Sequence, residues 1–216
     1  MKLYSGPLSM FGAKAEIAAH EKGLAFELVM VPFEMATLYQ PKHPEVLRIN
    51  PKRQVPVLID DGVEIFDSTQ IFEYLEDRFP EPPLWPREPA ARARARQLEL
   101  KSDEVFFPHV IKLMGFGGDR ARPEWSQARD GLTAFYDAME HQLADREWLA
   151  GPYTYADIAF FMAQFFAARH AVPMTVAHPR LRAWRLRVAA RPAVARVYDA
   201  MCAYLRSIDY PVPDYA

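Results

Sequence analysis

The 216-residue sequence contains one cysteine, Cys202, so no disulfide bond can form within the chain. A lone cysteine fits a reducing compartment. No apolar run approaches the ~20 residues that a membrane-spanning helix needs, and Met1–Tyr4 leads into small and polar residues rather than a signal peptide. The net charge of -2 gives no electrostatic reason to bind nucleic acid or an anionic membrane. We therefore expect a soluble, cytoplasmic protein without nucleic-acid or membrane partners.

Motifs of several enzyme classes are also missing. The six histidines show no H-E-x-x-H or other paired ligand spacing, so we expect no metal site. No G-x-S-x-G segment is present, which argues against a hydrolase of that type. The run Gly115–Gly118 is rich in glycine but lacks the Lys-Ser/Thr of a phosphate-binding loop, so it predicts a helix break instead.

Residues 1–80 alternate between strand and helix signals. Ser9 can cap a first helix that stops at Gly23, Asp61-Gly62 is a hairpin turn signal, and Ser68 is expected to cap another helix. The expected strands lie at 2–4, at 26–31 and on both sides of 61–62, and the expected helices at 9–22, at 44–49 and from 68 to just before 80. The order βαβαββα predicts an α/β domain with a mixed four-strand sheet covered by helices.

A proline-dense segment at 81–89 predicts a semi-rigid linker and a domain boundary. Beyond it, residues 90–216 read as an all-α domain. The segment from Thr154 to about Ala168 is apolar nearly all round, which predicts a buried central helix. The other expected helices run from about 90 to 114 and from 125 to about 143, with two shorter ones near 184–188 and 194–205.

The segment from Asn50 to Ser68 is the most informative part of the chain. Pro56 stands directly before an apolar run, and proline is tolerated in sheets only at strand starts, edges or bulges. This predicts a strand entry with free backbone groups, where the X-Pro bond can also be cis. Asp67 and Ser68 open the next helix, whose N-terminus favours anions. Free backbone groups beside a carboxylate and a helix N-terminus can hold a peptide-like ligand.

Ser9 has two interpretations. As a helix cap it satisfies backbone N–H groups of the first helix, which is the commoner role for a serine in this position. As a functional group it lies where the helix dipole favours anions, and its hydroxyl can stabilise a ligand thiolate and so lower the pKa of the thiol. Ser5 is the nearest rival for either role. No cysteine lies near Ser9, which argues against thiol-disulfide chemistry.

The groups around Asp67 suit a zwitterionic ligand. An ionised Asp67 can bind a ligand ammonium, while the hydroxyl and N–H of Ser68 bind its carboxylate. Val55 can exchange backbone hydrogen bonds with an extended peptide, as in strand addition. Positive charge for a second carboxylate comes from Lys42, Lys52 and Arg53. Together these groups describe a small peptide with two carboxylates and one amine.

Several segments in this order carry a resemblance to a known family: Leu3-Tyr4-Ser5, Ser9, Glu21-Lys22-Gly23-Leu24, Asn50-Pro51-x-x-Gln54-Val55-Pro56-Val57-Leu58, Asp67-Ser68, Tyr74-Leu75 and Gly151-Pro152-Tyr153-Thr154-Tyr155-Ala156-Asp157. The chain resembles the cytosolic glutathione transferases over nearly its whole length, as a serine-type bacterial member. In the last segment Thr154 and Asp157 would cap the buried helix reciprocally.

The resemblance implies a thioredoxin-like domain at residues 1–80 that binds glutathione as a co-substrate, with a cis bond between Val55 and Pro56. Ser9 would stabilise the thiolate, and Lys14 matches a basic residue that follows it. Asp67 and Ser68 would hold the γ-glutamyl end of glutathione. The remaining implied or possible contacts are Lys42, Gln54, Val55, Pro56, Ser5, Arg53 and, from the opposite subunit of a homodimer, Asp103. Arg53 departs from the family, which commonly has glycine there, and Gly12 is expected to loosen the start of the helix by about 0.5–1 kcal/mol relative to alanine.

An electrophile would approach the thiolate from its other side, and the resemblance implies an apolar acceptor pocket lined by the start of the first helix and the long helix after the linker. Its candidate residues are Phe11, Phe107, Val110, Ile111 and Met114. Core packing is the alternative role for each of them.

The leading hypothesis for function is a detoxifying transferase that activates the glutathione thiol for attack on an apolar electrophile. A closely related alternative is a glutathione-dependent β-etherase or dehalogenase, because bacterial β-etherases look similar from Asp67-Ser68 to Phe79 and around Trp148. The second alternative is a non-enzymatic, protein-binding member of the same fold.

Overall fold

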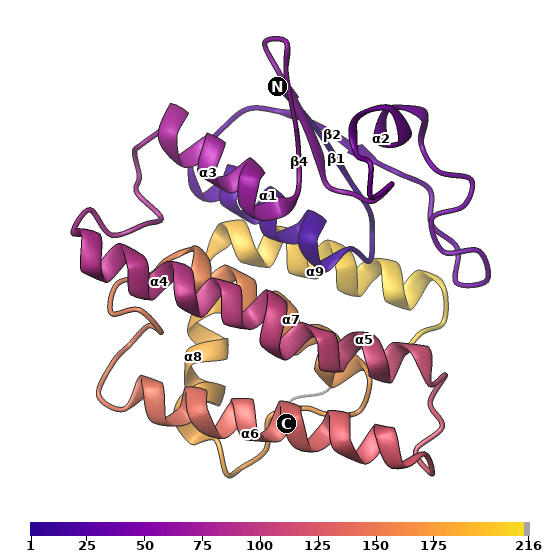
Figure 1. The fold of residues 1–216 in the computed structure, drawn as a ribbon, viewed down its shortest axis with the longest axis vertical. Helices are drawn as coiled ribbons and strands as arrows, with labels where there is room; N and C mark the ends of the chain where they lie inside the picture. Colours follow the sequence, from indigo (N-terminus) through magenta and orange to yellow (C-terminus); the bar gives the residue numbers. More distant parts are fainter. Residues whose placement is uncertain (214–216) are drawn as a thin grey trace. The chain divides into compact units, whose positions relative to one another are not determined.

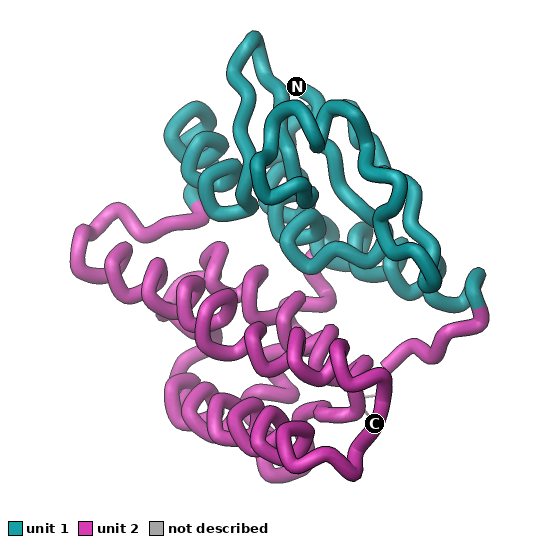
Figure 2. The backbone as a smooth tube through the Cα atoms, turned by 45° about the vertical axis from the view of Figure 1, so that its right-hand side comes forward, with its two compact units in different colours: residues 1–83, 192–208 teal, residues 84–191, 209–216 magenta. Residues whose placement is uncertain are grey.

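The computed structural model describes residues 1–213, and the described chain forms two compact units. The first unit contains residues 1–83 and 192–208 (Figure 2). The second unit contains residues 84–191 and, from the described end of the chain, residues 209–213. The first boundary falls close to the proline-dense linker. The last helix, however, clusters with the N-terminal residues, whereas the sequence places it in a C-terminal helical domain.

The first unit is built on a four-stranded mixed sheet, as predicted (Figure 1). Its strand order is β2-β1-β3-β4; β1 and β2 are parallel, and the other two pairs are antiparallel. The elements in chain order are β1 (Lys2–Ser5), α1 (Met10–Glu21), β2 (Glu27–Met30), α2 (Pro44–Ile49), β3 (Val57–Asp60), β4 (Val63–Phe66), α3 (Ser68–Arg78) and, from the end of the chain, α9 (Pro192–Ser207). This order confirms the βαβαββα prediction.

Both faces of this sheet are covered because successive strand residues point to opposite sides. Leu3 and Leu58 pack on one face with Ala15 of α1 and Ile71 of α3. The opposite face carries a smaller cluster of Tyr4, Val31, Val46 of α2 and Val57. Helix α1 also packs against α9, which therefore extends the layer on the α1 side.

The second unit is helical, as predicted. Its helices are α4 (Pro89–Lys101), α5 (Phe107–Gly115), α6 (Pro123–Leu143), α7 (Tyr155–Arg169) and α8 (Pro179–Ala189). The expected long helix over 90–114 is interrupted by a π-helical turn, η1 (Ser102–Phe106), between α4 and α5. Wider turns of this kind leave no clear signal in the side-chain periodicity. The chain leaves the helix at Gly115, which confirms the predicted helix break.

Helix α7 is the buried centre of this unit, and its predicted capping box is present. The Asp157 carboxylate accepts hydrogen bonds from Thr154 N and from its hydroxyl, at 2.9 and 3.2 Å. It also accepts from Leu149 N at 3.0 Å and from Trp184 Nε1 at 2.8 Å. Burial raises the pKa of Asp157, although these donors oppose the rise. One carboxylate therefore joins α7 to α8 and to the preceding loop. Among the described residues, no helix combines the length and apolar character needed to cross a membrane.

Candidate functional site

Residues predicted for ligand binding meet at one edge of the sheet. Tyr4 of β1 pairs with Val57 of β3, and Val57 pairs with Phe66 of β4. One step further along each strand, the register therefore brings Ser5, Pro56 and Asp67 side by side. Backbone pairing alone places the end of β1, the entry to β3 and the start of α3 together.

Ser9 is the N-cap of α1 at this edge. Its Oγ accepts a hydrogen bond from the backbone N–H of Gly12 at 3.0 Å, and its own N–H donates to the Gly6 carbonyl at 3.1 Å. The capping interpretation is thereby confirmed. The cap uses Oγ only as an acceptor, so the hydroxyl proton of Ser9 can still be donated to another group.

Ser5 and Ser9 both crowd Gly12. A Cβ atom on Gly12 would lie 2.2 Å from Ser5 Oγ and 3.1 Å from Ser9 Oγ, so only glycine fits here. Gly12 thus lets two hydroxyl groups approach the first turn of α1, a role that the sequence-based expectation of a loosened helix start missed. Ser5 is 1 % exposed, and its Oγ has no hydrogen-bond partner among the described residues.

Tyr39 contacts the loop between β1 and α1 at Gly6 and Leu8. Its hydroxyl accepts a hydrogen bond from Leu8 N at 3.3 Å. Its ring lies so close to Gly6 that a Cβ there would approach the ring within 2.4 Å. The ring also packs against Phe33, with 4.7 Å between centroids. Tyr39 and Gly6 therefore fix the position of the loop that leads to Ser9.

The loop before β3 is shaped by Asn50. Its side-chain amide donates to the Gln54 carbonyl at 2.6 Å and accepts from Lys52 N at 2.9 Å. Arg53 in this loop has a φ of 58°, in the left-handed region that glycine adopts readily. The loop therefore keeps a glycine-type conformation although the residue is arginine.

The bond between Val55 and Pro56 is cis, as the resemblance predicts. The ladder of β3 begins only at Val57, so the backbone N–H and C=O of Val55 lie outside it. Val55 can therefore offer these groups to an extended ligand, in the manner of an added strand.

Asp67, and not Ser68 as the sequence predicts, is the N-cap of α3. Its Oδ1 accepts from Thr69 N at 3.1 Å and from Gln70 N at 3.4 Å, whereas Ser68 is the first helical residue. Aspartate and serine are about equally good N-caps, but the carboxylate of Asp67 also complements the helix dipole. Asp67 has a φ of 78°, a conformation that non-glycine residues adopt mainly at functional sites or tight turns.

The positive charges predicted for a second carboxylate lie on two loops. Lys52 Nζ lies 3.9 Å from Asp67 Oδ2. Arg53 and Gln54 are exposed, and Lys42 is half-buried with its Nζ 6.0 Å from the Tyr39 ring centroid. These side chains all belong to the first unit.

The candidate acceptor residues differ in their surroundings. Phe11, in the first unit, is half-buried, and Lys14 Nζ lies 5.6 Å from the centroid of its ring. In the second unit Phe107 and Val110 are buried, and Phe107 packs edge-on against Phe166, as core residues do.

Ile111 and Met114 are 51 % and 42 % exposed, so they remain free to contact a ligand. Asp103 lies in the π-helical turn of the same unit. The acceptor pocket and the contact from Asp103 stay predictions.

Two family models match the chain in order. Residues 3–83 match the glutathione S-transferase N-terminal domain, and residues 99–192 match the glutathione S-transferase C-terminal domain. The chain belongs to the glutathione S-transferase family.

Two relatives named glutathione S-transferase agree with this assignment, and a third relative carries a different name. Glutathione S-transferase 3 of Zea mays is 31 % identical over 214 residues, which cover 93 % of this chain and 94 % of that protein. A glutathione S-transferase from Methylobacterium radiotolerans, solved in complex with glutathione sulfonate, is 30 % identical, with a TM-score of 0.76 over 91 % of this chain and 93 % of that one. The Stringent starvation protein A homolog of Coxiella burnetii is 35 % identical over 119 residues, and the match spans about half of each chain (54 % and 53 %).

In this member of the glutathione S-transferase family, sequence reasoning missed Tyr39 and the structural roles of Asn50 and Gly12. Each supports the candidate site without being expected to touch a ligand. The sequence contained a signal for Gly12, because a glycine within a helix lowers its stability and usually has a packing reason. Tyr39 had none, and Asn50 stood in the family motif without a role, because both roles depend on which backbone groups the loops bring beside these side chains.

Proposed function

We propose that this chain is a glutathione transferase in which Ser9 stabilises the glutathione thiolate. The observation that carries the proposal is the position of the Ser9 hydroxyl at the N-terminus of α1, held by Gly12 N–H at 3.0 Å. Family membership and the glutathione sulfonate bound to the Methylobacterium radiotolerans relative support glutathione as the ligand.

The rest of glutathione would lie along the sheet edge. Its γ-glutamyl ammonium would bind Asp67 Oδ2, because Oδ1 is already used as the helix cap. The γ-glutamyl carboxylate would bind Ser68 at the start of α3, where the helix dipole favours an anion. The cysteinyl backbone would pair with Val55. Lys42, Gln54 and Arg53 would contact the glycyl carboxylate.

This placement leaves the thiol near the start of α1. A free thiol has a pKa near ~8.5, so it is mostly protonated at neutral pH. The Ser9 hydroxyl donates a hydrogen bond to the sulfur, which favours the thiolate, and the partial positive charge of the helix N-terminus acts in the same direction. The thiolate then attacks an electrophilic carbon. A carbon–sulfur bond forms, and the leaving group departs with the electron pair of the bond that breaks.

The test is conjugation of glutathione to 1-chloro-2,4-dinitrobenzene, measured as kcat/KM against pH. A hydrogen bond to a charged group contributes about 1.5–3 kcal/mol, which corresponds to about 1–2 pKa units. Ser9→Ala should therefore raise the apparent pKa of the bound thiol by about 1–2 units, with the Kd for glutathione changed less than about threefold. Ser5→Ala is the matched control and should leave the pH profile in place. An unchanged profile for Ser9→Ala would remove Ser9 from the mechanism, and a shift in Ser5→Ala alone would assign its role to Ser5.

Two further outcomes distinguish the alternatives. Turnover of aryl ethers or halides with little conjugation of the dinitrobenzene would favour the β-etherase or dehalogenase reading. Glutathione binding without turnover of any of these substrates, or no binding at all, would favour a non-enzymatic, protein-binding role. Dimerisation and detoxification are parts of the same proposal, and sedimentation would test the first of them.

A further inference from the structure

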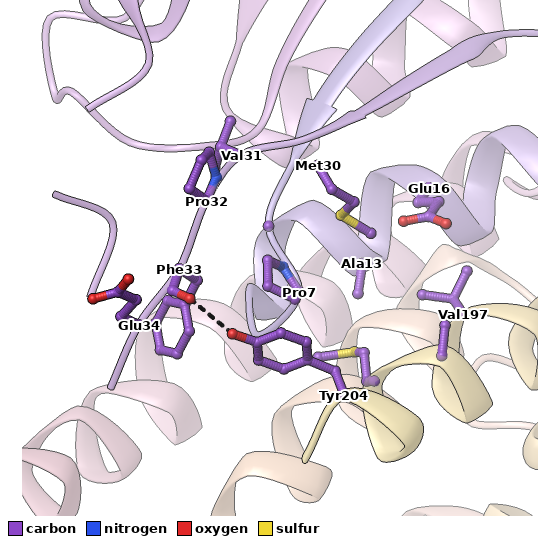
Figure 3. A pocket seen from close by; sticks show the side chains of 13 residues that line it. Pro7, Ala13, Glu16, Met30, Val31, Pro32, Phe33, Glu34, Val197 and Tyr204 are labelled. Carbon is purple, nitrogen blue, oxygen red and sulfur yellow. Dashed lines mark hydrogen bonds between the residues drawn. The ribbon is translucent and has the colours of Figure 1, made fainter. Parts of the chain in front are cut away.

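A cavity of about 510 Å³ lies within the first unit, between α1, the segment that follows β2, and α9 (Figure 3). Its size is in the range of small-molecule binding sites, roughly 300–1,000 Å³. None of the five residues predicted from the sequence for an acceptor pocket is among the described residues that line it. Gly6 and Pro7 of the loop between β1 and α1 also line it, so the cavity adjoins the loop that leads to Ser9.

Most of the lining is apolar. Met30 and Phe33 line it from β2 and the segment that follows, and Val197 and Met201 line it from α9. The Tyr204 hydroxyl donates a hydrogen bond to the Phe33 carbonyl at 2.8 Å, which ties α9 to the segment after β2 (Figure 3). The walls are thus held in place from two distant parts of the chain, and they suit an aryl or branched aliphatic group.

Glu16 departs from this apolar lining. It projects from α1, and in Figure 3 Met30 is drawn to its left and Val197 below it. The residue is 5 % exposed, and its Oε2 has no hydrogen-bond partner among the described residues. Its other oxygen lies 3.8 Å from His20 Nε2.

The described residues that line the cavity include no lysine, arginine or histidine. The second carboxylate of the lining, Glu34, is exposed. A buried carboxylate oxygen without a donor is unfavourable, and a ligand that supplies a charged N–H donor relieves that cost. The cavity therefore has apolar walls and one buried carboxylate oxygen, Glu16 Oε2, that lacks a hydrogen-bond donor among the described residues.

We propose that this cavity binds an organic cation, specifically a protonated amine attached to an aryl or branched apolar body. The ammonium group donates to Glu16 Oε2, and the apolar body lies against Met30, Phe33 and Met201. The rings of Phe33 and Tyr204 favour the same class of ligand, because aromatic faces attract cations and stack with aryl groups. The site does not require glutathione, so it stands or falls separately from the proposed transferase function.

The test compares three probes of one shape by titration calorimetry: 2-naphthylmethylammonium, 2-naphthylmethanol and 2-naphthoate. The wild-type chain should bind the ammonium at least tenfold more tightly than the alcohol, and the naphthoate more weakly than either. Methyl NMR signals of Met30 and Met201 should shift on binding. Equal affinity for the three probes, or shifts confined to other methionines, would overturn the proposal.

Glu16→Gln keeps the shape of the side chain and removes its charge. It should lower the affinity for the ammonium at least tenfold while leaving the affinity for the alcohol within about threefold. Glu34→Gln removes the same charge from an exposed position of the lining and should change both affinities less than threefold.

Ala200→Phe adds bulk at an exposed lining position, so the fold should tolerate it, and it should weaken binding of all three probes. Full selectivity in Glu16→Gln, or unchanged binding in Ala200→Phe, would show that the cation binds elsewhere.

Discussion

Replacing Gly12 with alanine should destabilise this protein, although the same change usually stabilises a helix. Alanine is favoured over glycine in helix interiors by about 0.8–1 kcal/mol. At Gly12, however, the added Cβ would lie 2.2 Å from Ser5 Oγ, 3.2 Å from Ser5 Cβ and 3.1 Å from Ser9 Oγ. Ser5 and Gly12 are both buried, so neither can move away freely.

The expected magnitude follows from these two opposing terms. Overpacking a well-packed interior costs typically 1–3 kcal/mol, and the gain in helix propensity offsets up to about 1 kcal/mol of it. The 2.2 Å approach to Ser5 Oγ places the overpacking cost in the upper part of that range, about 2–3 kcal/mol. Gly12→Ala should therefore lower the free energy of unfolding by about 1–2 kcal/mol. Urea denaturation followed by circular dichroism measures this change. Since the shift in α1 also moves Ser9, glutathione binding should weaken in the same variant.

Two comparisons isolate the cause. Ser5→Gly removes the atoms nearest to the new Cβ, so the double variant should recover most of the loss that Gly12→Ala causes. Gly115→Ala is the control, because no atom lies within 4 Å of a Cβ at that helical position. Gly115→Ala should be neutral or stabilising by up to about 1 kcal/mol. A neutral or stabilising Gly12→Ala, or a double variant with no recovery, would refute the close approach of Ser5.

Three further predictions concern charged or strained residues. Lys22→Met should cost about 3–5 kcal/mol in urea denaturation, because the buried Lys22 Nζ lies 2.6 Å from Glu76 Oε2 and donates to two backbone carbonyls. Arg53→Gly should leave stability within about 1 kcal/mol, since relief of the left-handed strain offsets the entropy of glycine, and should weaken glutathione binding in calorimetry. Burial, with the charge of Arg169, lowers the pKa of His170 to about 4, so stability present above pH ~6.5 should fall by up to about 3 kcal/mol as the pH drops towards 4.

Each of these three predictions would be contradicted by a specific result. For Lys22, it is a loss below about 1 kcal/mol, or an additive effect when Glu76→Leu is combined with it. For Arg53, it is unchanged glutathione affinity, which would remove the arginine from the ligand contacts. For His170, it is an acid unfolding curve that is the same in His170→Gln as in the wild-type chain, with the exposed His141→Gln as the matched control.

Much of the fold could be predicted from the sequence because local signals and tertiary structure agree. The capping residues Ser9 and Thr154, the hairpin turn at Asp61-Gly62 and the proline before β3 each act on the backbone within a few residues of themselves. Such signals fix the ends of elements and, through the strand register, the row of residues at the sheet edge. The π-helical turn and the clustering of α9 with the first unit could not be predicted, since they depend on packing between segments far apart in the chain.

The candidate site could be predicted only where a residue acts through its own chemistry. Asp67 is recognisable as a carboxylate at a helix start, but its φ of 78° and its role as the cap in place of Ser68 follow from how β4 enters α3. Arg53 is a second residue whose conformation could not be predicted from its own chemistry. The sequence suggests that an arginine in a glycine position alters the loop, yet the Asn50 side chain binds the backbone on both sides of it. Those two hydrogen bonds, together worth about 1–3 kcal/mol, are sufficient to hold Arg53 at a φ of 58° against a strain of about 1–2 kcal/mol. The loop shape is thus determined by Asn50 and does not need a glycine at position 53.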